Sequence, residues 1–145
     1  MNAQIVFMDS DNLFAKAIKA VTWSDWSHVG IMFGGDLVDS RYKDGGVTLT
    51  DYLTRVSQYK RIQILEVPIP AAKVWPYVTS QIGKPYDVSA VLGIPFRRDW
   101  QEDDKWFCSE LVAWAFGAAG HPLIYKQHGR VTPQDLYEAA RVRQL

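Results

Sequence analysis

Apolar residues recur along the chain with two different periods, one typical of strands and one typical of helices. Short runs rich in β-branched and aromatic residues predict strands over residues 4–8, 27–33, 36–42 and 61–67, the last closed by Pro68 and Pro70. Apolar residues spaced by three or four predict helices over residues 12–21, 48–59, 71–82 and 108–119, and a final helix that opens at Thr132-Pro133. In the predicted helix over residues 48–59, one face carries Leu49, Tyr52, Leu53 and Val56.

The second and third predicted strands form an antiparallel hairpin with its turn at Gly34-Gly35. The register of such a turn places His28 opposite Arg41, and it places Asp39 diagonally on the same sheet face as His28. A carboxylate in that position can orient an imidazole ring. Simpler interpretations stay open, with His28 as a hydrogen-bonded sheet residue and Asp39 as a solvated edge residue or the partner of Arg41.

The chain has one cysteine, Cys108, which stands where a charged loop turns into an apolar helix. Unpaired backbone N–H groups and the positive end of the helix dipole favour the thiolate, the form that attacks carbonyl carbon. A buried structural cysteine is the alternative, because free cysteine is among the most buried residue types. With His28 and Asp39, Cys108 completes the three roles that a thiol hydrolase requires.

Four short motifs are distributed over nearly the whole chain. They are Trp-Ser-His-Val-Gly-Ile at residues 26–31, Val-Asp-Ser at 38–40 with Gly-Gly-Val at 45–47, Ile-Gly-Lys-Pro-Tyr-Asp at 82–87, and Phe-Cys-Ser-Glu-Leu-Val at 107–112. Together they resemble the circularly permuted branch of the NlpC-type, papain-like cysteine hydrolases, the YiiX/YebB-like group. In ordinary papain-like enzymes the cysteine precedes the histidine, whereas here His28 precedes Cys108, and this inversion marks the permuted branch.

The resemblance implies one α+β domain over residues 1–145, with a papain-like antiparallel sheet and the nucleophile helix packed against it. It implies Cys108 as the nucleophile, His28 as the base and Asp39 as the third, polar member, where many members carry Glu. Tyr86 matches a tyrosine that helps to line the oxyanion site, although an aromatic plug after a turn proline is an equal alternative. The reaction implied is cleavage of an amide bond through a thioester, with a peptidoglycan stem peptide as substrate.

Further substrate-binding candidates surround the nucleophile. Trp26 belongs to a loop that leads to His28, while Trp100 and Trp106 interleave with charged residues just before Cys108. We expect the irregular segment 83–105 to border the cleft and select the substrate, with a solvated surface loop as the alternative. The Ser109 hydroxyl is a candidate for the oxyanion region, and N-terminal hydrogen bonding is its simpler role.

Composition limits the partners and cofactors. The formal net charge is zero, with 16 basic and 16 acidic residues, which gives no argument for binding nucleic acid. One cysteine allows neither an internal disulfide nor a cysteine-based zinc site, and the three histidines lack the close spacing of a metal motif. We therefore expect no metal and no cofactor, and a peptide or a lipid-linked small molecule as substrate. The sequence does not indicate an oligomeric state.

The N-terminus lacks the basic and apolar regions of a signal peptide, and no apolar run reaches the roughly 20 residues of a membrane span. This predicts a cytoplasmic protein, or a phage product released by lysis. Two other functions stay open. One is a lipid acyl hydrolase or acyltransferase, although Phe-Cys-Ser-Glu differs from the Asn-Cys-Glu-His typical of that branch. The other is an inert binding or structural module of a phage particle.

Overall fold

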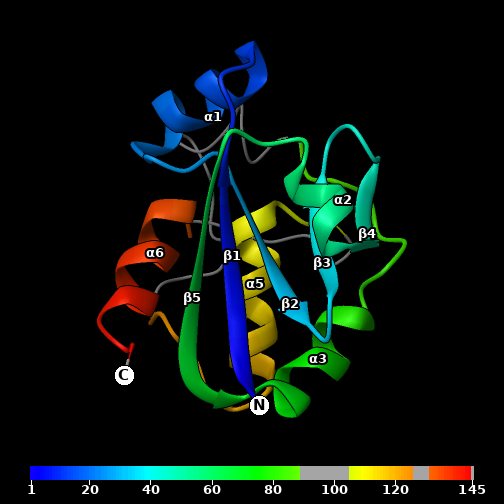
Figure 1. Ribbon diagram of the computed structural model, residues 1–145, viewed down its shortest axis with the longest axis vertical. Helices are drawn as coiled ribbons and strands as arrows, with labels where there is room; N and C mark the ends of the chain where they lie inside the picture. Colours follow the sequence, from blue (N-terminus) through cyan, green and yellow to red (C-terminus); the bar gives the residue numbers. More distant parts are fainter. Residues whose placement is uncertain (89–104, 126–130, 145) are drawn as a thin grey trace.

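Five antiparallel strands form one sheet in the order β4-β3-β2-β1-β5 (Figure 1). The computed structural model describes residues 1–88, 105–125 and 131–144. The strands are β1 (Asn2–Asp9), β2 (His28–Phe33), β3 (Asp36–Arg41), β4 (Gly46–Asp51) and β5 (Arg61–Pro70). The helices are α1 (Leu13–Thr22), α2 (Tyr52–Val56), α3 (Ala71–Thr79), α5 (Cys108–Ala118) and α6 (Pro133–Arg141).

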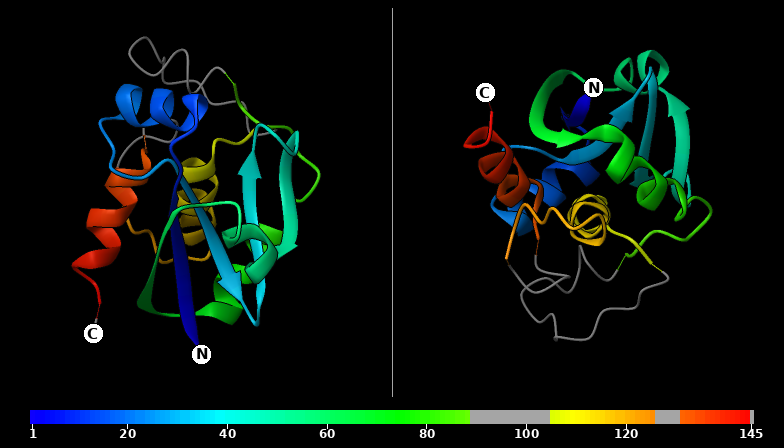
Figure 2. Two further views of the ribbon diagram at one scale, coloured as in Figure 1. Left: turned by 45° about the horizontal axis from the view of Figure 1, so that its top comes forward. Right: turned by 90° about the horizontal axis from the view of Figure 1, so that it is seen from below.

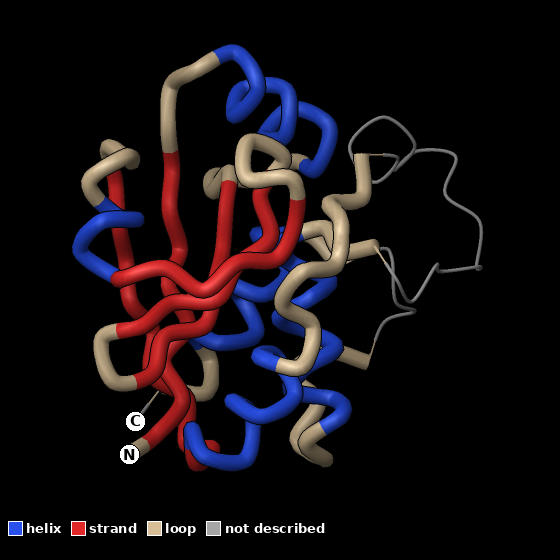
Figure 3. Tube along the Cα trace, turned by 90° about the vertical axis from the view of Figure 1, so that its right-hand side faces the viewer, coloured by secondary structure: helices blue, strands red, loops and turns tan. Residues whose placement is uncertain are grey.

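The two faces of the sheet are covered differently. Alternate residues of β1 point to opposite faces, so that Ile5 and Phe7 join a large core with α3 and α5, while Val6 and Met8 join a smaller one beside α2. Figure 3 shows the strands with the short α2 on one side and longer helices on the other. In Figure 2, α5 is seen end-on beside the sheet. The nucleophile helix predicted from the sequence therefore packs against an antiparallel sheet, which confirms the expected α+β class.

The predicted hairpin is confirmed, with a ladder that runs from Phe33 opposite Asp36 to Ile31 opposite Val38. Both turn glycines have positive φ angles, 61° for Gly34 and 92° for Gly35, a conformation that other residues avoid. The ladder ends at the pair Ile31 and Val38, so His28, at the start of β2, is not paired with β3. The β2 and β3 strands therefore part at the end of the sheet where α1 and the start of α5 lie.

The predicted helix over residues 48–59 is wrong. Residues 46–51 form β4 instead, in which Thr48 lies opposite Asp39, and only residues 52–56 are helical. Pairing with β3 overrides the helical spacing, and the Asp51 side chain then caps α2 by accepting a hydrogen bond from the Thr54 N–H. The expected shared face does not exist, because Leu49 and Leu53 are exposed.

Two prolines do not stop β5 where the sequence suggested. The strand continues to Pro70, with a register irregularity opposite Asn2 and Ala3. Proline is tolerated there because β5 is an edge strand of the sheet that the described residues form. The predicted opening of the last helix is confirmed, since Thr132 caps α6 and Pro133 is its first residue.

The segment that carries Tyr86 is held in place by a close backbone contact with the start of β4. The Val47 N–H donates to the Lys84 carbonyl, and the Tyr86 N–H donates to the Gly45 carbonyl. A Cβ atom on Gly46 would lie 2.0 Å from the Lys84 carbonyl oxygen, so only glycine fits. Two of the sequence motifs, around residues 45–47 and 82–87, therefore meet through their backbones.

Candidate active site

His28 and Asp39 form a buried polar pair at the parted end of β2 and β3. The His28 Nε2 atom lies 2.7 Å from Asp39 Oδ2, and the Asp39 side chain has no exposed surface. Gly30 makes the approach possible, since a Cβ atom there would lie 3.0 Å from the Asp39 Cβ. Because the carboxylate can only accept, the neutral imidazole donates from Nε2, and Nδ1 is left as the basic nitrogen.

Arg55 of α2 also binds the Asp39 carboxylate, through both of its oxygens. Its Nη2 donates to Asp39 Oδ1 at 3.2 Å, and its Nε lies 2.9 Å from Oδ2 as an ion pair. The same Nη2 contacts Asp44, Thr48 and Thr50 within 3.2 Å. A buried carboxylate without a cation is costly, so Arg55 offsets the burial of Asp39 and fixes its orientation toward His28.

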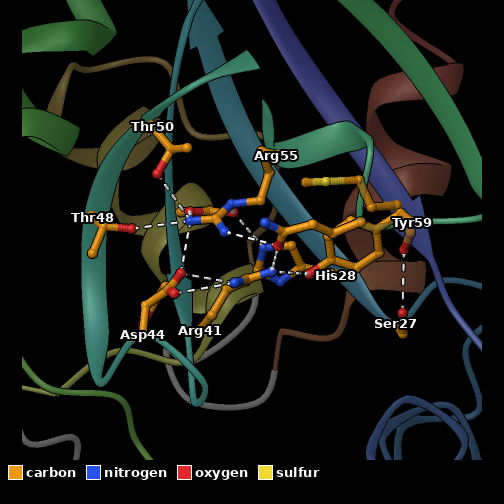
Figure 4. A network of polar contacts seen from close by, with 12 residues as sticks. Ser27, His28, Arg41, Asp44, Thr48, Thr50, Arg55 and Tyr59 are labelled. Atoms are coloured by element: carbon orange, nitrogen blue, oxygen red, sulfur yellow. Dashed lines mark hydrogen bonds and ion pairs between the residues drawn. The ribbon is translucent and has the colours of Figure 1, made fainter. Parts of the chain in front are cut away.

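Tyr59 covers the imidazole. Its ring is stacked on that of His28, with centroids 5.5 Å apart and an interplanar angle of 4°. The Tyr59 hydroxyl accepts a hydrogen bond from Arg41, whose guanidinium also binds Asp44 (Figure 4). Arg41 thus pairs with Asp44, and the partner of Asp39 is Arg55, which differs from the Arg41 alternative considered for the sequence.

Cys108 is the first residue of α5 and is 1% exposed. Burial raises the pKa of its thiol to about 12, although backbone N–H groups of Val29, Ser109 and Cys108 itself act in the opposite direction. The nearby negative charge of Asp39 also raises this pKa. The thiolate expected from the helix N-terminus is therefore not the resting form, because burial outweighs the dipole.

A single pocket brings Cys108, His28 and Tyr86 together. It has a volume of about 270 Å³ and lies between α1, the parted ends of β2 and β3, and the start of α5. Its lining residues are Ser10, Asn12, Phe14, Ala15, Ile18, Ser27, His28, Ser40, Arg41, Tyr42, Lys43, Tyr59, Tyr86 and Cys108. The two remote chain segments that carry the thiol and the imidazole thus open onto one cavity.

Tyr86 forms part of the aromatic wall of this pocket. Its ring contacts those of Phe14, Tyr42 and Phe107, with centroids 6.0 to 6.4 Å apart. Burial raises the pKa of the Tyr86 hydroxyl, and the charge of Cys108 raises it further. The shift moves the pKa further above neutral, where a tyrosine hydroxyl is already protonated, and the hydroxyl lies within the electrostatic reach of the sulfur.

The other predicted substrate-binding residues are not part of the pocket lining. The Trp26 ring packs in the core against Phe7 and Tyr137. Trp106 is 1% exposed, and its Nε1 donates to Gln81. The Ser109 hydroxyl donates to the Val131 carbonyl at 2.6 Å, so it fills neither the oxyanion role nor the N-terminal hydrogen bonding expected for it. Trp100 lies outside the described residues.

Sequence reasoning missed Arg55 and Tyr59. Both follow β4, in the segment interpreted as one continuous helix, where a basic residue resembles a solvated surface position. The available signal was the alternation of Thr48 and Thr50, which share a sheet face with Asp39 once residues 46–51 are assigned to a strand. A polar stripe on a half-buried face requires a partner, and Arg55 is the first cation that follows the strand along the chain.

The sequence model of one protein family, the permuted papain-like amidase enzymes of the YaeF/YiiX type, matches residues 2–144 of this chain. The chain belongs to this amidase family. Its members are cysteine-type peptidases or amidases, and the order of His28 before Cys108 agrees with the permutation. The resemblance stated from the sequence motifs is thereby confirmed.

Two proteins from Escherichia coli are similar to this chain. YaeF of strain K12, named a probable lipoprotein peptidase, is 57% identical over 37 residues, which is 24% of this chain and 14% of YaeF. The crystal structure of YiiX from O157:H7, described as a metalloprotein, has a TM-score of 0.61 and 23% identity, and the match covers 85% of this chain and 68% of YiiX. The likeness to YiiX supports the fold.

The described residues contain neither a group of metal-binding side chains nor a helix suited to span a membrane. In the part of the chain that the structure describes, no group of three or more His, Cys, Asp and Glu side chains is placed to hold a metal ion. Along residues 1–88, 105–125 and 131–144, no helix combines the length and apolar character needed to cross a bilayer.

Proposed function

We propose that the chain cleaves an amide bond with Cys108 as the nucleophile, His28 as the general base and Asp39 as the group that orients the imidazole. The observation that carries the proposal is the pocket shared by Cys108 and His28, together with the 2.7 Å contact between His28 Nε2 and Asp39. The arrangement supplies a thiol as nucleophile, an imidazole as its base, and a carboxylate that orients the imidazole.

The steps follow from these atoms. As the sulfur bonds to the amide carbon, the thiol proton passes to His28 Nδ1, and the carbonyl oxygen becomes an oxyanion. The oxyanion collapses, the C–N bond breaks, and the leaving nitrogen takes the proton from Nδ1, which leaves a thioester. Water then loses a proton to Nδ1 and attacks the thioester, and the departing sulfur recovers the proton. Asp39 stabilises the imidazolium that forms in each half of the cycle.

The oxyanion requires fixed hydrogen-bond donors near the sulfur. The Cys108 N–H is the first such donor, because the N-terminus of α5 has no side-chain cap that would occupy it. The Tyr86 hydroxyl is the second, since Tyr86 lines the same pocket and a tyrosine hydroxyl is a protonated donor at neutral pH.

We expect alkylation of Cys108 in the free protein to be slow at neutral pH. The folded pKa of about 12 exceeds the ordinary value of 9.0, so the thiolate fraction near pH 7 is about a thousandfold lower than in unfolded chain. The rate with iodoacetamide should rise about tenfold per pH unit from roughly pH 6 to 9, because thiolate accumulates with pH. The stability that the neutral buried thiol contributes is lost progressively as the pH rises from 9.0 to about 12, because the unfolded chain releases the thiol proton first.

The control for this measurement is the urea-denatured protein, which should titrate near the ordinary thiol pKa. The label reports a single site because Cys108 is the only cysteine. A folded protein whose labelling rate is already constant below about pH 8 would contradict the neutral resting thiol.

Replacement of Gly30 by Ala should lower kcat by about 10- to 100-fold, because the new methyl group pushes Asp39 away from His28. The matched control is Gly117→Ala in α5, where a Cβ atom meets nothing within 4 Å. Steady-state kinetics and thermal unfolding of both variants give the result. Normal kcat in a folded Gly30→Ala protein would show that the Asp39 contact is dispensable.

For the substrate we propose a short peptide with a carboxylate, as in a peptidoglycan stem. Aromatic rings form much of the pocket wall, and Lys43 lies exposed on its lining and makes no ion pair with the described residues. An apolar wall of Phe14, Ala15 and Ile18 favours a lipid-linked amide as the second candidate.

A substrate panel separates these candidates. Muropeptides, lipopeptides and acyl esters are incubated with the wild type and with Lys43→Gln, and the products are identified by mass spectrometry. We expect cleavage of carboxylate-bearing peptides, with KM raised in Lys43→Gln and kcat unchanged. Hydrolysis of esters alone, or of no amide, would refute the proposed reaction.

A further inference from the structure

The hydrogen bond to Asp39 holds only one nitrogen of the His28 ring, Nε2. The torsional preference about the Cβ–Cγ bond of histidine is broad, so this bond does not itself choose a plane for the ring. Nε2 lies closer to the axis of the Cβ–Cγ bond than Nδ1 does. A rotation about that axis therefore displaces Nδ1, the proposed base, more than it displaces the nitrogen that Asp39 holds. The plane of the imidazole requires a second contact.

The ring of Tyr59 provides such a contact. It lies parallel to the imidazole, with an interplanar angle of 4° and centroids 5.5 Å apart. Parallel rings at this separation form an offset stack, an arrangement that aromatic pairs prefer. A rotation of the imidazole about its Cβ–Cγ bond would tilt one edge of the ring toward the tyrosine face. The stack thus restrains the motion that the hydrogen bond to Asp39 restrains least.

The backbone around Tyr59 anchors this ring to the sheet. The Tyr59 N–H donates to the Val56 carbonyl at 3.1 Å, in the turn that follows α2. The N–H of the next residue, Lys60, donates to the carbonyl of Asp9 at the end of β1, at 3.0 Å. The Tyr59 side chain packs against the smaller core beside α2. Tyr59 is therefore attached to β1, the strand that pairs with the strand of His28.

The hydroxyl of Tyr59 joins the polar contacts that hold Asp39 (Figure 4). Arg41 Nη1 donates to this hydroxyl at 3.4 Å, and Arg41 Nε and Nη2 donate to the two Asp44 oxygens at 2.8 and 3.1 Å. Asp44 Oδ2 also accepts from Arg55 Nη2 at 2.7 Å, and Arg55 binds Asp39. The two groups that contact the imidazole are thus linked to each other through two arginines and one aspartate.

We propose that Tyr59 is a positioning residue, whose ring sets the plane of the His28 imidazole so that Nδ1 faces the pocket that Cys108 lines. This role rests on the proposed function, in which His28 is the base. Tyr59 makes and breaks no bond in the reaction. It acts through His28, and the stacked ring is the part that acts, while the hydroxyl only helps to hold the ring in place.

Steady-state kinetics with the best amide substrate test this role. Tyr59→Leu removes the stack and should lower kcat by about 10- to 100-fold, with KM within about twofold of the wild type, because the base is misplaced. Tyr59→Phe keeps the ring and should retain kcat to within about threefold. The matched control is Tyr52→Leu, which removes another partly buried tyrosine from the same smaller core, outside the pocket lining, and should leave kcat normal. Thermal unfolding of all three variants should remain cooperative.

A measurement on the free protein separates positioning from contact with the substrate. NMR relaxation of histidine labelled at Cδ2 reports the order of the ring plane, and the His28 signal is assigned by its absence in His28→Asn. We expect an order parameter of about 0.8 for the wild type and Tyr59→Phe, and below about 0.6 for Tyr59→Leu. No turnover is involved, so this result does not depend on whether Cys108 is the nucleophile.

The outcomes distinguish this role from the proposed reaction. Turnover by Cys108→Ala would refute the reaction, whereas normal kcat in a folded Tyr59→Leu protein would overturn only the role of Tyr59. A loss of kcat in Tyr59→Leu without any change in the order of the His28 ring would also overturn it, in favour of a direct contact between Tyr59 and the substrate. Equal inactivity of Tyr59→Phe would assign the effect to the hydroxyl and contradict the role of the ring.

Discussion

The substitution Cys108→Ala is expected to abolish amide hydrolysis, with kcat/KM reduced by about 10⁴-fold or more. No other cysteine exists to take over the attack, and the chain offers no second thiol near His28. Hydrolysis by water alone would lack the thioester that divides the reaction into two easier steps. Turnover of the best substrate from the panel, measured for wild type and variant at equal concentration, gives the result.

The control must separate lost chemistry from lost structure. Cys108 is buried in the core that joins α5 to the sheet, so removal of its sulfur leaves a small cavity. Cys108→Ser keeps nearly the same volume and should be almost equally inactive, since a hydroxyl beside this base is a much poorer nucleophile. Thermal unfolding of both variants should remain cooperative. Substantial turnover by either folded variant would exclude Cys108 as the nucleophile.

The substitution Asp39→Ala is expected to affect both stability and activity. It removes the buried carboxylate that pairs with Arg55 while Asp44 still contacts the guanidinium, which should lower the free energy of unfolding by about 1–3 kcal/mol. The imidazole also loses the acceptor at Nε2, so kcat should fall by about 10²-fold or more in the protein that remains folded. Asp39→Asn keeps the shape and should show a smaller loss of stability.

A double variant distinguishes the two effects. In Asp39→Ala/Arg55→Met, the buried cation that faced Asp39 is gone as well, so part of the lost stability should return, whereas activity should stay low because His28 is still not oriented. Urea unfolding followed by tryptophan fluorescence measures the first quantity and steady-state kinetics the second. If the double variant recovers activity together with stability, Asp39 acts on folding and not on the imidazole.

Local pattern was sufficient for those parts of the fold where short-range chemistry decides the conformation. The hairpin at Gly34-Gly35 and the helix opening at Thr132 depend on neighbouring residues, and both were predicted. The segment 48–59 depends on pairing between distant positions, because Thr48 and Thr50 become strand residues only when β3 lies beside them. Helical spacing of apolar residues could not reveal that partner.

The candidate site, too, could be predicted from the sequence only in part. Strand parity was enough to place Asp39 on the face of His28, and the two side chains do meet. The ionisation of Cys108 was predicted in the wrong direction, because burial is a property of the whole fold and not of the helix N-terminus. Trp26 and Trp106 were expected at the substrate and instead complete the core, as aromatic residues near a site often do. Their sequence positions do not distinguish the two roles.

The most direct test of the proposed reaction is to trap the acyl-enzyme. Wild-type protein is mixed with the best amide substrate, quenched in acid within the first turnover, and examined by intact-protein and peptide mass spectrometry. The thioester mechanism predicts a mass increase equal to the acyl part of the substrate, located on the peptide that contains Cys108, lost on treatment with hydroxylamine and absent in Cys108→Ala. A cleaved substrate with no adduct under conditions where a thioester would accumulate, or an adduct on another residue, would contradict the proposed role of Cys108.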